Sequence, residues 1–197
     1  GLAWIMLGYA EQLEFLATLK DAELQFAGGK QKIERIFREA ARAAADFYIA
    51  NTPADGIPYW DTGAPGLQKL GNYLDKPADP FNNHEPVDSS AAAIAAQGLL
   101  RLGHYLGETK GRQYRQAGLT VFNTLLDRPY LSTNRKHQGL ILHSVYHRPN
   151  GWDHIPAGRK IPCGESSMWG DYHAREAALY VQRIIDGKPY LKFWKQE

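Results

Sequence analysis

The fold is decided by DSSAAAIAAQGLLRLGHYLG (residues 88–107), in which an acidic residue and two serines open a helical run. The same unit recurs as ESSMWGDYHAREAALYVQRIIDG (165–187). Each copy follows a long loop with a similar extended piece, GIPYWD (56–61) before the first and GLILHS (139–144) before the second. A repeat of this size predicts helical hairpins set side by side.

Apolar residues spaced by three and four predict amphipathic helices along most of the chain. We expect five of them, over residues 2–19, 31–49, 89–105, 113–126 and 167–185. Over residues 91–96 the third helix has small side chains on almost every side. Neighbouring helices can therefore approach it closely, which favours a central position for this helix. Asp88 and Ser166 are the expected N-caps, and Gly187 is the expected C-terminal cap.

Two of the connections, residues 51–87 and 129–164, are much longer than the others. Loops of this length in a compact domain are usually functional. Each long loop leaves one helix at its C-terminus and enters the next helix at its N-terminus. Both loops should therefore lie on the same side of the helical layer. The first, third and fifth helices then form one class and the second and fourth another, which is the alternation of inner and outer helices in an α/α toroid. The partial positive charge of the inner N-termini would face the loops and suit an anionic or polyhydroxylated ligand.

The helices are too few to close such a ring. We therefore expect an all-α single domain, residues 1–197, that forms about half of a six-hairpin toroid. The chain starts inside a helical pattern, which indicates a piece of something longer. The apolar flanks of the first and last helices would then be covered by a missing N-terminal half of the barrel or by a second chain.

Composition excludes several classes of protein. A hydrophobic content of 44% and a charged content of 22% are those of a soluble globular protein. The net charge of +2 is spread along the chain without a basic stripe, so nucleic acid is not an expected partner. No apolar run reaches the roughly 18 residues that a membrane span needs.

Cys163 is the only cysteine, so no intrachain disulfide framework is expected and a cytoplasmic or a periplasmic location stays open. The N-terminal residues do not have the pattern of a signal peptide. His147, His154, His173 and Cys163 match no zinc-ligand spacing, so we expect neither a metal nor another cofactor.

The chain has 5 Trp and 11 Tyr, and several of these lie in loops beside Gly, Pro and Asp. They are either aromatic lids over a helical core or part of a carbohydrate site, where flat rings stack on sugar faces.

Four blocks in order, DGIPYWD (55–61), DSSAAAIAAQGLL (88–100), GLILHSVYH (139–147) and SSMWGDYHAREAAL (166–179), resemble unsaturated glucuronyl hydrolases, glycoside hydrolase family 88. GLAW (1–4) resembles the end of that family's Trp-Ala-Arg-Gly-x-Ala-Trp pattern. The resemblance implies the C-terminal half of an (α/α)6 barrel. It also implies a substrate, an oligosaccharide that a polysaccharide lyase has released with a 4,5-unsaturated uronic acid at its end.

In the family an aspartate protonates the double bond at C4, water adds at C5, and the hemiketal opens and expels the rest of the sugar. Such chemistry needs one carboxyl that gives and takes a proton. The family's catalytic aspartate, its second aspartate and its His-Gln pair lie before the point where this chain begins. The catalytic residues are therefore unknown within this chain, which would supply walls of the site and be inactive alone. The alternatives are an unsaturated rhamnogalacturonyl hydrolase or a truncated, non-catalytic fragment that binds carbohydrate or a partner.

The candidate substrate-binding residues are Trp4, Trp60, Asp61, Asp88, His143 and Arg159. Trp4 falls on the family's last motif Trp, a sugar-stacking position, unless it is a core residue at a helix start. Trp60 and Asp61 end the first extended piece, where they either flank a sugar ring or form a structural turn. Asp88 caps its helix and, if that helix is an inner one, also faces the cavity.

His143 holds the place of Trp60 in the second extended piece, and it either faces the cavity or is a hydrogen-bonded core residue. Arg159 lies where the family can carry a Ser-x-x-Ser-x-Lys motif for sulfated substrates. That motif is absent here, so Arg159 and Lys160 either contact substrate or form a solvated basic turn. For Asp171, in the first turn of the last helix, we expect structural support.

Overall fold

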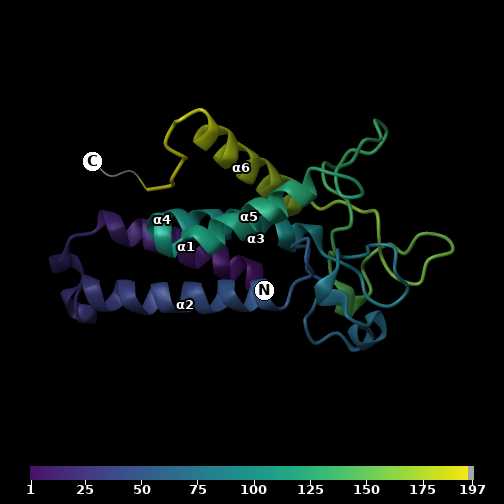
Figure 1. Ribbon diagram of the computed structural model, residues 1–197, viewed down its shortest axis with the longest axis horizontal. Coiled ribbons are helices and arrows are strands. Elements are labelled where there is room, and N and C mark those ends of the chain that lie inside the picture. The colour runs from purple at the N-terminus through teal and green to yellow at the C-terminus, as the bar shows by residue number, and fades with distance from the viewer. Residues whose placement is uncertain (195–197) are drawn as a thin grey trace.

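The computed structural model describes residues 1–194, and it consists of α-helices in two layers with long loops at one end (Figure 1). The α-helices are α1 (Leu2–Thr18), α2 (Lys30–Ala50), α3 (Ser89–Tyr105), α4 (Gly107–Lys110), α5 (Arg112–Leu125) and α6 (Met168–Ile185). Short 3-10 helices lie in the connections, namely η1 (Asp21–Ala27), η2 (Pro65–Leu70), η3 (Tyr73–Asp75) and η4 (Arg148–Asn150). Within the described residues, extended backbone forms only the isolated bridges Tyr59–Val87 and Leu131–Ile141.

The helices α1 and α6 flank α3 in one layer, while α2 packs against α1 and α5 packs against α3 in the other. The five predicted helices are thereby confirmed, and each agrees within two residues at both ends. The connection between α1 and α2 contains the additional short helix η1. The all-α prediction is confirmed for residues 1–194.

The central position predicted for α3 is confirmed by its burial. Its alanines at 92, 93, 95 and 96 are fully buried. Gly98 lets α1 approach, because a Cβ atom there would lie 2.8 Å from the backbone nitrogen of Leu7. Small residues therefore bring the backbones of α1 and α3 into direct contact, which is the close approach that the sequence of α3 indicates.

The caps of the helices agree with the sequence except at one position. The Asp88 side chain accepts from the backbone nitrogens of Ser90 and Ala91, as expected of an N-cap. Gly187 has a φ of 67° and its N–H donates to the Ile184 carbonyl, as expected after a helix end.

The N-cap predicted at Ser166 is wrong, because the N-cap of α6 is Ser167, whose Oγ accepts from the Gly170 backbone nitrogen at 3.2 Å. The Ser166 hydroxyl donates instead to the Ile141 carbonyl at 2.6 Å. Ser166 is thus committed to the second extended piece, and α6 begins one residue later.

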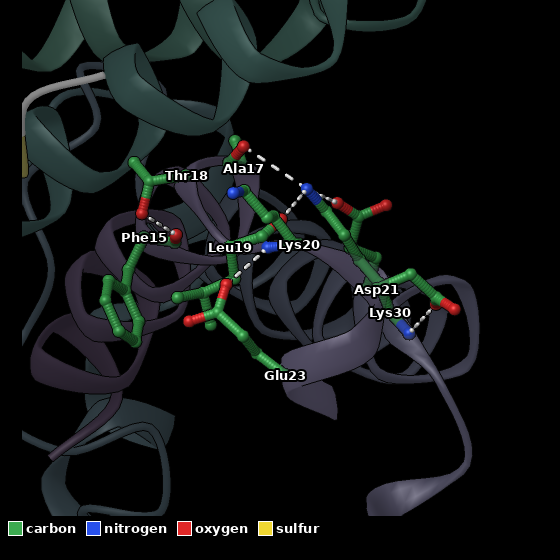
Figure 2. Close-up of polar contacts among 9 residues, drawn as sticks. Phe15, Ala17, Thr18, Leu19, Lys20, Asp21, Glu23 and Lys30 are labelled. Carbon is green, nitrogen blue, oxygen red and sulfur yellow. Dashed lines mark hydrogen bonds and ion pairs between the residues drawn. The ribbon is translucent and has the colours of Figure 1, made fainter. Parts of the chain in front are cut away.

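At the end of the molecule away from the long loops, the turn between α1 and α2 is closed by local hydrogen bonds (Figure 2). Lys30 Nζ donates to the carbonyls of Ala17 at 3.2 Å and Leu19 at 2.7 Å, which would otherwise be free at the end of α1. Asp21 Oδ1 accepts from the Lys30 backbone nitrogen at 2.8 Å. The α1–α2 connection is therefore short, and local hydrogen bonds within it satisfy polar backbone groups at this end of the molecule.

The two long loops gather at the N-terminal ends of α3 and α6, as predicted (Figure 1). In the first loop, the buried Glu85 accepts from Trp60 Nε1 at 2.7 Å and from the Gly66 nitrogen at 2.8 Å. In the second, the Asp171 carboxylate accepts from the backbone nitrogens of Leu140 and Ile141 at 2.8 and 3.0 Å, so its predicted structural role is confirmed. Glu85 therefore joins two parts of the first loop to each other, and Asp171 holds the second loop to the first turn of α6.

Candidate functional site

The two acid-Ser-Ser units meet at Ser144, in the second extended piece. Ser144 Oγ lies 3.2 Å from Ser89 Oγ and accepts from Ser167 Oγ at 3.1 Å. The Ser144 backbone nitrogen donates to the Glu165 carbonyl at 2.9 Å. These bonds place the first turns of α3 and α6 next to each other, so the sequence repeat becomes one local structure.

Among the described carboxylates at the end of the molecule that carries the long loops, Asp88 accepts the most hydrogen bonds. Its Oδ1 accepts from Ser90 Oγ at 2.6 Å and from the nitrogens of Ser90, Ala91 and Val145 at 3.0, 3.3 and 3.3 Å. Burial raises the pKa of Asp88 above its usual value, and the bonds from Ser90, Val145 and Ala91 oppose that rise. Asp88 thus orders the junction of the two units.

One cavity at this end, which we call the first cavity, has a volume of about 300 Å³. It lies between the start of α1, the end of α2 and the first extended piece, and its lining includes Trp60, Asp61 and Asp88. Glu85 fixes the Trp60 indole, and Asp61 Oδ1 accepts from the Gly63 nitrogen at 2.6 Å. The structure therefore brings three of the six candidate residues together.

The second cavity, of about 320 Å³, opens at the N-terminus of α6. Its lining residues are Ser144, Tyr146, Trp152, Asp153, His154, Pro162, Glu165, Ser166, Ser167, Met168 and Trp169. Nothing in the sequence groups Tyr146, Trp152 and Trp169, although the excess of loop aromatics pointed to a site of this kind. Their rings stand in series, with centroids 5.4 Å apart for Trp169–Tyr146 and 5.8 Å apart for Tyr146–Trp152.

A hydrogen bond links the residues of the two cavities. Trp169 Nε1, at the second cavity, donates to Ser90 Oγ at 3.0 Å, and Ser90 Oγ donates to Asp88 at the first. The two cavities are thus connected through the starts of α6 and α3.

Trp4 lies on the face that α1, α3 and α6 share and lines neither of these two cavities. Its side chain is 49% exposed, and its ring meets the His173 ring edge-on at 5.0 Å. His173 Nδ1 is 2.7 Å from Gln97 Oε1, and Gln97 Nε2 donates to Glu176 at 3.3 Å. Burial lowers the pKa of His173. Trp4 is therefore half-exposed outside the cavity that Trp60 lines.

His143 and Arg159 are not brought to either cavity. His143 is 3% exposed, its Nδ1 accepts from the Gly164 nitrogen at 3.1 Å, and its ring packs edge-on against Phe81 and Tyr130. The Arg159 guanidinium lies over the Phe81 ring at 5.0 Å and donates to the Phe81 carbonyl at 3.2 Å. Both placements favour a structural role over ligand contact.

In the part of the chain that the structure describes, no three His, Cys, Asp or Glu side chains are grouped as metal ligands. None of the helices within residues 1–194 is both long and apolar enough to cross a membrane.

No protein-family model matches the chain. An unsaturated glucuronyl hydrolase from Bacillus sp. (strain GL1) is 28% identical over 192 residues, which cover 96% of this chain and 40% of that protein. A second, from Formosa agariphila, is 28% identical over 187 residues, covering 94% of this chain and 36% of that protein. The chain is homologous to unsaturated glucuronyl hydrolases. Its resemblance to them is thus confirmed, and it spans about 40% of the length of these curated relatives.

Solved structures of unsaturated glucuronyl hydrolases share the fold of this chain. The crystal structure of the Bacillus sp. GL1 enzyme, responsible for the degradation of glycosaminoglycan, matches 98% of this chain with a TM-score of 0.66 and 24% identity, over 41% of its own length. A variant of the Streptococcus agalactiae enzyme in complex with dGlcA-GalNAc6S matches 89% of this chain with a TM-score of 0.55 and 22% identity, over 37% of its own length.

Proposed function

We propose that this chain is part of a glycoside hydrolase that removes an unsaturated uronyl residue from oligosaccharides made by polysaccharide lyases. The observation that carries the proposal is homology to unsaturated glucuronyl hydrolases along nearly the whole chain. The reaction proposed is hydration of the 4,5 double bond, with a proton added at C4 and water at C5, after which the hemiketal opens and releases the remaining sugar.

We propose that the fold is the C-terminal half of an (α/α)6 toroid, with residues 1–197 as one domain. In this arrangement α1, α3 and α6 are inner helices and α2 and α5 are outer ones. The two layers, the common direction of α1, α3 and α6, and the coverage of the relatives support it. Exposed apolar residues on α6, such as Tyr172 and Ile185 at 57% and 74%, would contact the rest of the barrel or a second chain.

We assign walls of the substrate site to this chain and leave the proton donor outside it. Trp60, Asp61 and Asp88 line the first cavity and would contact sugar there. Trp4 would stack on sugar from the face shared by the inner helices. His143 and Arg159 would act on substrate only through the loop residues that they hold, Gly164 and Phe81.

The test uses the protein expressed from its complete reading frame and a lyase-generated unsaturated disaccharide. Hydration of the double bond removes its ultraviolet absorbance, so a steady loss of absorbance is the expected result. A panel that includes an unsaturated rhamnogalacturonan disaccharide separates the two hydrolase candidates, because the released sugar differs. No loss with any member of the panel would overturn the proposal and leave a non-catalytic binding role.

A further inference from the structure

We propose that His173 is a substrate-binding residue, whose Nε2 accepts a hydrogen bond from a hydroxyl group of a sugar bound against Trp4. Gln97 and Glu176 are its positioning residues, because they determine which nitrogen of the ring carries the proton. That the sugar belongs to the substrate rests on the proposed function, whereas the arrangement of the ring does not.

His173 lies in the second turn of α6, on the face that α1, α3 and α6 share. The Trp4 ring, from the first turn of α1, meets the His173 ring edge-on with centroids 5.0 Å apart, and the Tyr172 ring does the same at 5.0 Å. His173 is 7% exposed, whereas Trp4 is 49% exposed. The imidazole is therefore held by its neighbours directly beside a half-exposed indole.

A chain of two hydrogen bonds places the proton on the His173 ring. Gln97 Nε2 lies 3.3 Å from Glu176 Oε2, and a carboxylate can only accept, so the amide NH2 group faces Glu176. The amide oxygen of Gln97 then faces His173 Nδ1 at 2.7 Å. Because an amide oxygen also only accepts, Nδ1 carries the hydrogen and Nε2 has the free lone pair.

The ring is neutral at pH 7, since burial lowers the pKa of His173 below its ordinary value of 6.5. A neutral imidazole donates through one nitrogen and accepts through the other. With Nδ1 donating to Gln97, the group that His173 offers to a ligand is an acceptor.

The lone pair of Nε2 is accessible to a ligand. Among the described residues, the side chain of His173 makes its hydrogen bond through Nδ1. The buried side-chain nitrogens and oxygens that lack a partner within residues 1–194 are Arg101 Nε, Tyr130 Oη and Ser132 Oγ, and Nε2 of His173 is not among them. A nitrogen that has no protein partner and is not buried is reached by solvent, so a ligand hydroxyl can replace water there.

This arrangement selects a hydrogen-bond donor next to Trp4. A sugar hydroxyl group can donate to Nε2, whereas the ionised carboxylate of a uronyl residue has only acceptor oxygens. The centroids of the Trp4 and His173 rings are 5.0 Å apart, so a pyranose in contact with the indole has hydroxyl groups within reach of Nε2. The chemistry on offer is thus that of a neutral hydroxyl-bearing ring face.

Two substitutions of His173 separate the roles of its nitrogens. The side-chain amide of Asn falls near the position of Nδ1 and that of Gln near the position of Nε2. In the protein from the complete reading frame, His173→Asn is expected to raise KM for a lyase-generated unsaturated disaccharide about threefold to tenfold with kcat nearly unchanged, the effect of losing one neutral hydrogen bond. His173→Gln keeps the outer acceptor and is expected to recover most of the loss. His84→Asn makes the same change at an exposed position that lines neither cavity, and it is the matched control.

The positioning role is tested by the protonation of the ring. Long-range proton–nitrogen NMR spectra of the histidine-labelled protein at pH 7 should show His173 protonated on Nδ1 and bare on Nε2, with the signals assigned by their loss in His173→Asn. Gln97→Met keeps the length of the side chain without its amide, and it is expected to move part of the proton to Nε2 and to raise KM. Glu176→Gln no longer dictates the orientation of the Gln97 amide and is expected to act in the same direction. A wild-type ring protonated on Nε2 would overturn the proposal, and an Nδ1 proton unmoved in both variants would overturn the positioning roles.

A binding experiment separates failure of the His173 contact from failure of the proposed function. Quenching of tryptophan fluorescence by the same disaccharide does not depend on hydrolysis. If the wild type hydrolyses no unsaturated substrate but binds the disaccharide, and His173→Asn weakens that binding where His84→Asn does not, the contact stands and the proposed function fails. If the wild type is active and His173→Asn matches His84→Asn in both KM and quenching, the contact is overturned and the function stands. The absence of both hydrolysis and quenching in the wild type would overturn both.

Discussion

Trp169 Nε1 donates a hydrogen bond to Ser90 Oγ at 3.0 Å, and this contact joins the first turn of α6 to the first turn of α3. Ser90 Oγ in turn donates to Asp88 Oδ1 at 2.6 Å. Ser90 is 2% exposed, and its hydroxyl bridges the Trp169 indole and the Asp88 carboxylate. The two copies of the acid-Ser-Ser unit are therefore coupled through side chains as well as through the backbone.

The first prediction concerns this hydroxyl. Ser90→Ala is expected to lower the free energy of unfolding by about 1–2 kcal/mol, because it leaves the Trp169 N–H without a partner and removes a bond to Asp88. Urea denaturation followed by circular dichroism measures the effect. Ser132→Ala is the control, since Ser132 Oγ has no hydrogen-bond partner among the described residues and its loss should be nearly neutral. Equal effects of the two substitutions would contradict the coupling.

The second prediction concerns pH. Burial lowers the pKa of His143 from about 6.5 to about 4, so the folded state binds this proton less tightly than the unfolded state does. The stability that the neutral ring supplies is fully present above pH 6.5 and is lost as the pH falls toward 4. The loss is expected to reach about 3 kcal/mol, from the linkage between a pKa shift and stability.

The variant that tests this is His143→Asn. Asn tolerates the φ of 71° at this position and keeps an acceptor for the Gly164 nitrogen, but it does not titrate. Unfolding free energies at pH 7 and pH 4.5 should differ less in the variant than in the wild type. A pH dependence as steep as that of the wild type would show that His143 is not the group responsible.

Much of this fold can be predicted because the signals are local. The small residues of α3 indicate its central position, the lengths of the two loops indicate that they share one end, and Asp88 has the side chain that an N-cap needs. The Ser166 cap was mispredicted because its hydroxyl is taken by the carbonyl of Ile141, a residue of the preceding loop. Sequence spacing around a helix start does not reveal such a tertiary partner.

The row of aromatic rings at the second cavity, Tyr146, Trp152 and Trp169, is not predictable from spacing for a similar reason. Trp169 belongs to α6, whereas Tyr146 and Trp152 belong to the loop before it. Their alignment depends on the turn that Asp153 closes and on the bond from Trp169 to Ser90. Likewise, the spacing of Trp4, Trp60 and His143 in the sequence does not show that only Trp60 reaches a cavity with Asp88.

The third prediction tests the contact between α1 and α3. Gly98→Ala would place a Cβ atom 2.8 Å from the Leu7 nitrogen, so the two helices must move apart. The free energy of unfolding is expected to fall by about 1–3 kcal/mol. Gly8→Ala, in α1, is the matched control, because a Cβ atom there meets no atom within 4 Å and Ala should stabilise the helix by about 0.5–1 kcal/mol. Thermal unfolding should therefore shift in opposite directions, and shifts in the same direction would refute the close approach.

The fourth prediction links the first loop to substrate binding. Glu85 is 6% exposed and holds both the Trp60 indole and the Gly66 nitrogen, so its charge fixes a wall of the first cavity without lining it. Glu85→Gln keeps the size of the side chain but has one acceptor oxygen where the carboxylate has two, so one of the two bonds is lost and the other loses its charged acceptor. In the protein from the complete reading frame, KM for an unsaturated disaccharide is expected to rise about threefold to tenfold, with kcat nearly unchanged.

Glu39→Gln removes the same charge from an exposed position on α2 and is the control for net charge. A fall in kcat for Glu85→Gln at constant KM would contradict a positioning role, because loosening a binding wall weakens substrate binding before it affects the chemical step. A red shift of the tryptophan emission in Glu85→Gln, absent in Glu39→Gln, would show independently that Trp60 has become more hydrated. The combination of raised KM and shifted emission is what distinguishes a displaced Trp60 from a general loss of stability, which would lower the amount of active protein without changing KM.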